Sequence, residues 1–181
     1  MGNDPIGLDF IEGSLGVISL TFDGTELGTS MDEANLEKIE DITDIFHAQF
    51  GTQPADKIIT GQAYQLTVML DDITAARLAK LIQGLTISSG GHSVAFGTDL
   101  YRSAYQNFAK ELKAARVDSD GVASTNQKYI MTFYKAYPTV NGSLGPFGPS
   151  TQRSIEVVFY IFKELVTKKF GFYGYASSLG L

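Results

Sequence analysis

The sequence predicts a mainly β protein, and three observations carry that prediction. The 181 residues include 19 glycines, 12 phenylalanines and 9 tyrosines, a composition typical of short strands joined by tight turns. Residues 64–70 alternate with a period of two, with Tyr64, Leu66 and Val68 on the more apolar side. Residues 155–162 are apolar on both sides, as expected of a strand buried between two layers. We therefore expect strands to build the core.

Shorter strands are predicted around these two. Residues 15–22 favour a strand, which Asp23-Gly24 closes with the chemistry of a hairpin turn. The glycine-rich residues 88–91 form a turn before a short strand at 94–96. We also expect a strand at 129–136, a loop rich in glycine and proline at 141–149, and an aromatic strand at 170–175.

One helix is predicted at residues 73–83. Asp71-Asp72 can cap its N-terminus, and Gly84 is placed to end it. An apolar stripe recurs at helical spacing, at Ile73, Ala76, Leu78, Leu81 and Ile82. Because this stripe must be covered, we expect the helix to share one core with the two main strands. The residues expected to be buried there are Leu66, Leu78, Leu81, Val157 and Phe159.

Two segments have patterns that fit more than one structure. In residues 34–50, apolar side chains recur every three positions, as on one face of a helix, but the threonine and isoleucine content suits a bulged strand equally well. Residues 101–115 follow helical spacing, which predicts a helix there, with a strand disturbed by a bulge as the alternative.

The composition argues against several classes of function. Twenty acidic residues against 14 basic ones give a formal net charge of −6, unlike that of a protein that neutralises nucleic-acid phosphates. Cysteine is absent, which excludes thiol catalysis, disulfides and thiolate metal sites. The first residues lack the features of a secretory signal, and no apolar run approaches the roughly 20 residues of a membrane span. We expect one domain, residues 1–181, made in the cytoplasm without membrane insertion.

No group of residues predicts an active site. His47 and His92 lack the sequence context of a catalytic base, and no G-x-S-x-G elbow accompanies them. Asp118 and Asp120 lack the later oxygen ligands of a calcium loop and are typical of a polar turn. Residues 88–91 lack the lysine and the glycine spacing of a phosphate-binding loop. We therefore expect a protein that is not an enzyme and that holds no metal or cofactor.

Carboxylates are concentrated between residues 32 and 44. A glycosidase could use a pair of them, but a solvated acidic surface is the favoured interpretation. The group comprises Asp32, Glu33, Glu37, Glu40, Asp41 and Asp44.

Two stretches of sequence resemble a known family. Residues 51–61 read G-T-x-P-x-D-x-I-x-T-G, and they precede the alternating strand, the acidic pair and the predicted helix. Residues 153–159 read R-x-I-x-V-x-F. This combination is similar to the tail tube proteins of long-tailed bacteriophages, which share their fold with the tubes of type VI secretion and other contractile injection systems. Gln62 stands where the family often has an acidic residue, and the family pattern expects a strand at 101–117.

The resemblance implies a fold, an assembly and a function. It implies a β-sandwich or barrel-like tail tube domain with a flanking helix at about 73–83, and an N-terminal arm (1–14) and a long loop (about 49–59) as assembly elements. Such proteins form homohexameric rings that stack into the tail tube of the virion, a conduit for genome delivery, with tape-measure, baseplate and, in contractile tails, sheath proteins as partners. An acidic lumen would repel DNA, and Glu37, Glu40, Asp41 and Asp44 are the candidates to line it.

Two other interpretations come from different classes. A β-sandwich module that binds carbohydrate or another small ligand is suggested by the tyrosines and by the loop at 141–149, and it predicts a concave aromatic site on a monomer. A hydrolase that uses His47 or His92 is the least favoured interpretation.

Overall fold

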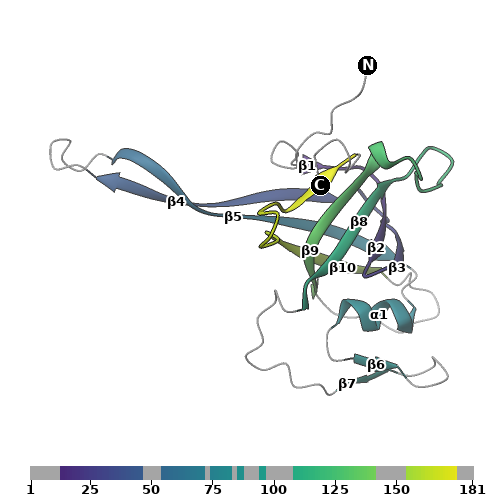
Figure 1. The fold of residues 1–181 in the computed structure, drawn as a ribbon. Coiled ribbons are helices and arrows are strands. Elements are labelled where there is room, and N and C mark those ends of the chain that lie inside the picture. Colours follow the sequence, from purple (N-terminus) through teal and green to yellow (C-terminus); the bar gives the residue numbers. More distant parts are fainter. Residues whose placement is uncertain are drawn as a thin grey trace.

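The fold is dominated by one antiparallel sheet. The computed structural model describes residues 13–46, 54–71, 74–82, 85–87, 94–96, 108–141 and 154–174. The main sheet is open, runs in the order β1-β4-β5-β10-β9-β8-β2-β3, and carries β11 along β9 (Figure 1). Its strands are β1 (Gly13–Ser14), β2 (Ile18–Phe22), β3 (Thr25–Thr29), β4 (Asn35–Phe46), β5 (Pro54–Asp71), β8 (Lys110–Arg116), β9 (Ile130–Asn141), β10 (Ser154–Phe162) and β11 (Gly171–Tyr173).

Three smaller elements accompany the main sheet. The helix α1 (Ala75–Leu81) follows β5, and β6 (Leu85–Ile87) pairs with β7 (Val94–Phe96) in a separate two-stranded sheet. A short 3₁₀ turn at Gln127–Tyr129 precedes β9. The predicted mainly β architecture with one helix is therefore confirmed.

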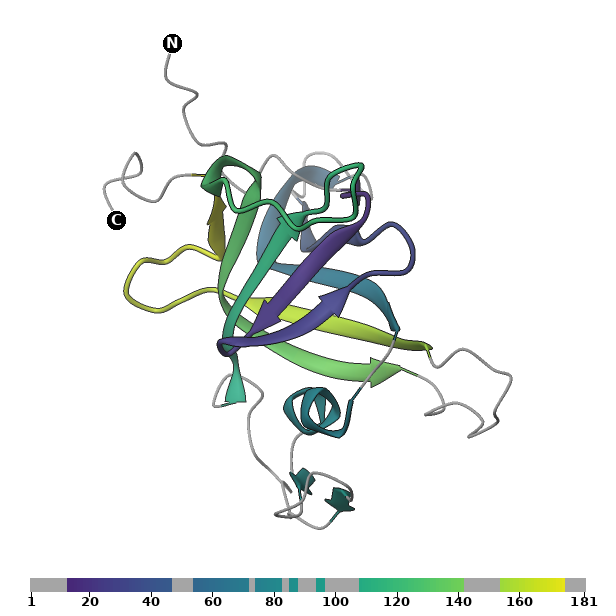
Figure 2. The same ribbon diagram turned by 90° about the vertical axis from the view of Figure 1, so that its right-hand side faces the viewer.

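The main sheet is strongly curved (Figure 2). Ser30, just after β3, forms an isolated antiparallel bridge with Leu70 of β5, and the Met31 amide donates to the Met69 carbonyl at 2.8 Å. This contact brings the last strand of the sheet back toward the second half of β5. The apolar side chains on the concave side are thereby enclosed by a single sheet.

The core lies inside this curve and contains most of the predicted residues. Leu66, Val157 and Phe159 are fully buried, and Leu81 of the helix is 1% exposed. Leu78 is only partly buried but packs against the same cluster. Aromatic contacts tie distant segments together: the rings of Phe22 and Phe159 are 5.8 Å apart, and Phe170 meets Tyr64 edge to face at 4.9 Å.

The turn between β2 and β3 forms as predicted. Asp23 and Gly24 have φ values of +49° and +72°, and a two-residue hairpin connection of this kind matches the twist of the strands it joins. Strand β2 begins at Ile18, three residues later than the predicted strand at 15–22.

The predicted helix is present over Ala75–Leu81, but its cap differs from the prediction. Asp71 is the last residue of β5 and pairs with Ser154, so it cannot cap the helix. Thr74 is the N-cap instead, and its Oγ1 accepts from the Arg77 amide at 3.3 Å. Residues 72–73 and 83–84 lie outside the described residues.

Two polar contacts hold α1 over the hairpin of β2 and β3. Lys80 Nζ is 2.9 Å from Asp23 Oδ2, and the hydrogen bond from Lys80 lowers the pKa of that carboxyl. Arg77 Nε donates to the Glu26 carbonyl at 3.2 Å. The helix is therefore fixed to the body by side chains that leave its apolar stripe free to face the core.

The helix expected at 101–115 is wrong over most of the part that the structure describes: Phe108 is helical, but residues 110–115 lie in a strand. Lys110–Arg116 is β8, which pairs with β2 on one side and β9 on the other. Leu112 and Ala114 are buried on the same side of the strand. The helical spacing is overridden because pairing with two neighbouring strands outweighs the weak helix preference of the segment. Residues 101–107 lie outside the described residues.

The loop expected at about 49–59 is also corrected. Residues 54–59 are the first third of β5 and pair with β4, so the ambiguous segment 34–50 is a strand over Asn35–Phe46. Residues 49–53 lie outside the described residues, as do His47, His92, the turn at 88–91 and the N-terminal residues 1–12.

The remaining predictions are mostly confirmed. Strands occupy residues 94–96, most of 129–136 and 155–162, and part of 170–175, and residues 118–121 form a turn in which the Gly121 amide donates to the Asp118 carbonyl at 2.9 Å. The loop expected at 141–149 lies outside the described residues beyond Asn141.

Truncation of the core should destabilise the body much more than truncation of a surface side chain. Leu66→Ala is expected to lower the free energy of unfolding by about 2–5 kcal/mol, because it leaves a cavity between β4, β5 and β10. The control Leu165→Ala changes a side chain that is 77% exposed and should alter it by less than about 0.5 kcal/mol. Urea denaturation measures both, and equal effects would contradict this assignment of the core.

Candidate functional site

The most distinctive feature of the molecule is a hairpin that projects from the body (Figure 1). β10 pairs with β5 only from Tyr64 onward, and β1 pairs with β4 only at Asn35 and Leu36. In the described part of the chain, residues 37–46 and 54–63 therefore pair only with each other. We call these residues the projecting hairpin; at about 3.3 Å per residue it is about 30 Å long.

Two irregularities shape the projecting hairpin. The register shifts between Asp41 and Ile42 and again between Ile45 and Phe46, so that β5 contributes an extra residue at each point. At the first shift, Thr60 Oγ1 donates to the Asp41 carbonyl at 3.1 Å. A Cβ at Gly61 would lie 2.9 Å from Asp41 Oδ2, so only glycine fits there without moving the Asp41 side chain. β4 keeps its own alternation through both shifts.

One side of the projecting hairpin has a formal charge of zero, and we call it the neutral face. On β4 it continues the side of the buried Leu36, and its charged groups form two ion pairs. Lys38 Nζ lies 2.6 Å from Glu40 Oε1, and Lys57 Nζ lies 3.5 Å from Asp44 Oδ1. The full set on this face is Lys38, Glu40, Ile42, Asp44, Phe46, Lys57, Ile59 and Gln62.

The opposite side carries only negative charge, and we call it the acidic face. Its carboxylates are Glu37, Asp41 and Asp56, and no lysine or arginine of the projecting hairpin shares this side. Ile39 and Ile58 lie among them and are 37% and 50% exposed. The whole net charge of the projecting hairpin, −3 from five carboxylates and two lysines, therefore sits on one face.

The four predicted site residues share a strand but not a face. Glu37 and Asp41 lie on the acidic face, whereas Glu40 and Asp44 lie on the neutral face in ion pairs. Hydrogen bonds from Lys38 and from Gln62 Nε2, the latter at 3.0 Å, lower the pKa of Glu40. Asp32 and Glu33 lie before β4 and are exposed. Asp56 was missed because the sequence assigned it to a loop rather than to a strand opposite Ile45.

Large apolar side chains are exposed on both faces of the projecting hairpin. Of ten such residues among those the structure describes, five lie here. Phe46, Ile42 and Ile59 on the neutral face are 59%, 54% and 52% exposed. Within the described residues, no part of the core covers these side chains, and exposed apolar patches of this kind are typical of interaction surfaces.

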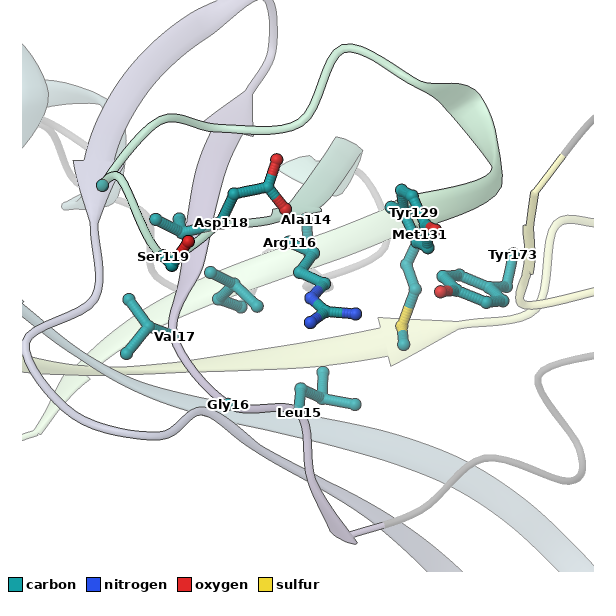
Figure 3. Close-up of a pocket in the computed structure, with 13 residues that line it drawn as sticks. Leu15, Gly16, Val17, Ala114, Arg116, Asp118, Ser119, Tyr129, Met131 and Tyr173 are labelled. Atoms are coloured by element: carbon teal, nitrogen blue, oxygen red, sulfur yellow. The ribbon is translucent and has the colours of Figure 1, made fainter.

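A cavity of about 740 Å³ opens in the body, away from the projecting hairpin. Figure 3 shows the Arg116 side chain reaching into its middle from β8, with Tyr129, Met131 and Tyr173 on one side. The guanidinium carbon lies 5.7 Å from the centre of the Tyr129 ring. The other lining residues are Leu15, Gly16, Val17, Ile18, Ala114, Val117, Asp118, Ser119 and Gly121.

A metal ion in a protein is held by a grouping of ligating side chains. Within the described residues, no group of three or more histidine or acidic side chains is arranged to hold a metal ion. Asp118 and Asp120 belong to the exposed turn before Ala123, as the sequence suggested. None of the helices in the described ranges is long and apolar enough to cross a bilayer.

Comparison with known proteins adds no relative. No protein-family model matches the chain. No curated protein matches it either. The functional argument therefore rests on the residues and on the geometry described above.

Proposed function

We propose that this protein is a structural virion protein, the subunit of a phage tail tube, which forms homohexameric rings that stack into a conduit for genome delivery. The observation that carries the proposal is the projecting hairpin, an element with exposed apolar side chains on both faces and no covering surface in the described chain. Fully burying an exposed large apolar side chain is worth about 1.5–3 kcal/mol, so covering each half-exposed side chain of the neutral face is worth roughly half of that. Repeated around a ring, such contacts would stabilise the assembly, and an isolated subunit cannot make them.

The positions of the two family-like motifs support the proposal. Residues 54–61 of the first motif form the β5 half of the projecting hairpin, and residues 154–159 of the second lie in β10. β5 and β10 are neighbours, with Ile155 opposite Leu70 and Phe159 opposite Leu66. The strand β8 also agrees with the strand that the family pattern expects at 101–117. The second motif therefore lies beside residues 66–71, the strand that follows the first motif, whereas the first motif itself pairs with β4.

The charge distribution suggests how the subunit is oriented in a tube. A lumen that carries DNA must not bind phosphates, and carboxylates facing it repel the duplex. The acidic face, with Glu37, Asp41 and Asp56, suits the lumen, while the neutral face suits contact with protein because its net charge is zero and it carries exposed apolar side chains. Of the four predicted lumen residues, this proposal retains Glu37 and Asp41, moves Glu40 and Asp44 to the contact side, and adds Asp56.

The same proposal implies the partners and the location. Tape-measure protein and DNA would occupy the lumen, baseplate proteins would join one end, and a sheath would surround the tube in a contractile tail. The subunit would be made in the host cytoplasm and would reside in the virion tail. It would act as a scaffold rather than as an enzyme and would need no cofactor.

A ligand-binding module is the second candidate, and the cavity beside Arg116 is the observation in its favour. Its volume falls in the range of about 300–1,000 Å³ that is typical of small-molecule sites, and two tyrosines line it. This candidate leaves the projecting hairpin without a role, which is why we rank it second. A thermal-shift screen with glycans and aromatic acids on the monomer distinguishes the two, because only a ligand module should respond.

Assembly should depend on the neutral face of the projecting hairpin. The wild-type protein should form hollow rings and tubes in negative-stain electron micrographs at high concentration. Ile42→Asn/Ile59→Asn should remain monomeric, with a thermal midpoint within a few degrees of wild type, because both side chains are half exposed in the subunit. Leu165→Asn, an equally polar change away from the projecting hairpin, should still assemble. A wild-type protein that stays monomeric at every concentration would refute the proposed function.

Reversing charge on the acidic face should make the tube bind DNA. Glu37→Lys would add a positive charge to every subunit of each ring, and its tubes should retain duplex DNA in a sedimentation assay at about 50 mM salt and release it by about 200 mM, through counterion release. Assembly should be unaffected because exposed charges contribute little to stability. Glu111→Lys makes the same change on β8 and serves as the control. Equal DNA retention by both variants would contradict a lumen lined by the acidic face.

A further inference from the structure

The cavity in the body contains a charged side chain, Arg116, that forms no ion pair with the described residues of the same subunit. Its walls come from five separate parts of the chain: the connection before β2, the end of β8, the turn at 117–121, Tyr129 with β9, and β11. Apolar side chains such as Leu15, Val17 and Met131 line much of it (Figure 3). A volume of about 740 Å³ is large enough for several side chains rather than for one water molecule.

Arg116 makes this cavity specific for an anion. The guanidinium stacks near the Tyr129 ring, and Lys128 Nζ lies 4.5 Å from the centre of the same ring. In the part of the chain that the structure describes, Arg116 forms no ion pair. Asp118 also lines the cavity, but its carboxylate is not within ion-pair distance of Arg116. The complementary partner is therefore a carboxylate next to a large apolar group.

The outer end of the projecting hairpin presents that combination. Phe46 is 59% exposed on the neutral face, and Asp44 precedes it by two residues on the same face. The only described cation beside Asp44 is Lys57, at 3.5 Å in an exposed ion pair that is easily exchanged. The projecting hairpin as a whole carries a net charge of −3, which favours its approach to the arginine that lines the cavity.

A chain cannot place this end in its own cavity. The projecting hairpin extends away from the body (Figure 1). The cavity is lined only by residues of the body. The occupant must therefore come from a second copy. When a protruding element and its complementary cavity lie on different parts of one molecule, the contact between copies is heterologous. Repetition of such a contact generates rings or filaments.

We propose that the cavity beside Arg116 receives the outer end of the projecting hairpin of a second copy, with Phe46 inside and Asp44 paired with Arg116. The inference rests on the proposed function, and it identifies the contact that joins neighbouring subunits. Phe46 would supply the buried anchor of the interface, and the charge pair at its edge would fix the orientation.

Because the chain contains no cysteine, introduced cysteines can be crosslinked without background from native ones. Ile45→Cys and Ser119→Cys are prepared as separate proteins, mixed, assembled and treated with a short bismaleimide, so that a product joining the two variants can arise only between copies. Ile45 is the neighbour of Phe46 in β4, so the proposed anchor is kept. Ser119 lines the cavity, and the change to cysteine replaces only its hydroxyl oxygen. Leu165→Cys replaces Ser119→Cys in the control, because Leu165 is exposed but lies outside the cavity. We expect a mixed dimer with Ser119→Cys in at least tenfold excess over the control.

Each outcome separates this inference from the proposed function. Tubes without the mixed dimer would overturn the inference and leave the proposed function standing. A mixture with neither tubes nor the dimer would overturn both. If 3-phenylpropionate protects Ser119→Cys from labelling in the monomer while assembly does not, the cavity binds a small aromatic acid and the inference is wrong.

A charge exchange tests the ion pair itself. Arg116→Glu should lower the yield of the mixed dimer at least tenfold, because it places two carboxylates together, and Asp44→Arg in the other copy should restore most of that loss. If Arg116→Glu alters the fold, Arg116→Gln is used instead, and it should reduce the yield of the mixed dimer less. Thermal midpoints of the isolated subunits check that each variant is folded. If none of these three substitutions changes the yield of the mixed dimer, the proposed pairing of Asp44 with Arg116 is wrong.

Discussion

The pairing of β5 is the constraint on which the rest of the structure depends. This single strand of 18 residues pairs with β10 over its second half and with β4 along most of its length. Its inner side chains, from Tyr64 to Leu70, fill the core, and the same strand then continues out of the body as one side of the projecting hairpin. The register that buries Leu66 opposite Leu36 therefore also determines which residues lie on the neutral and acidic faces. A slip of one residue would exchange the two faces and expose the core side chains.

Sequence patterns predicted the parts of the fold that have one buried face. The alternation at 64–70 and the apolar run at 155–162 reflect contact with the core and were found where expected. The stripe of α1 contacts the core through Leu78 and Leu81, whereas Ala76 is exposed. The projecting hairpin was not predicted because neither of its faces is buried in the core, so Ile58 and Ile59 stand side by side without a period of two. β8 was mistaken for a helix because its lysine, glutamate and alanine residues favour helices locally, whereas its pairing with β2 and β9 is nonlocal.

The candidate sites were predictable only in part, for the same reason. Composition located the carboxylates of β4, but their division into Glu37 with Asp41 and Glu40 with Asp44 depends on strand alternation, and Asp56 joins the first pair only through the register with β5. The cavity could not be predicted at all, because its walls come from five segments that the folded sheet brings together. Nothing in the sequence singles out Arg116, which becomes informative only when the structure shows that it lines the cavity and forms no ion pair with a described residue.

The central claim is that the projecting hairpin is an assembly element whose neutral face is covered by other subunits. Hydrogen exchange measured over a series of protein concentrations tests it most directly, since exchange reports the covering of backbone amides without any mutation. Amides in residues 37–46 and 54–63 should become protected as concentration rises through the onset of assembly, while those of β10, which is already buried, should not change. Exchange in the projecting hairpin that stays equally fast in dilute and concentrated samples would contradict the claim.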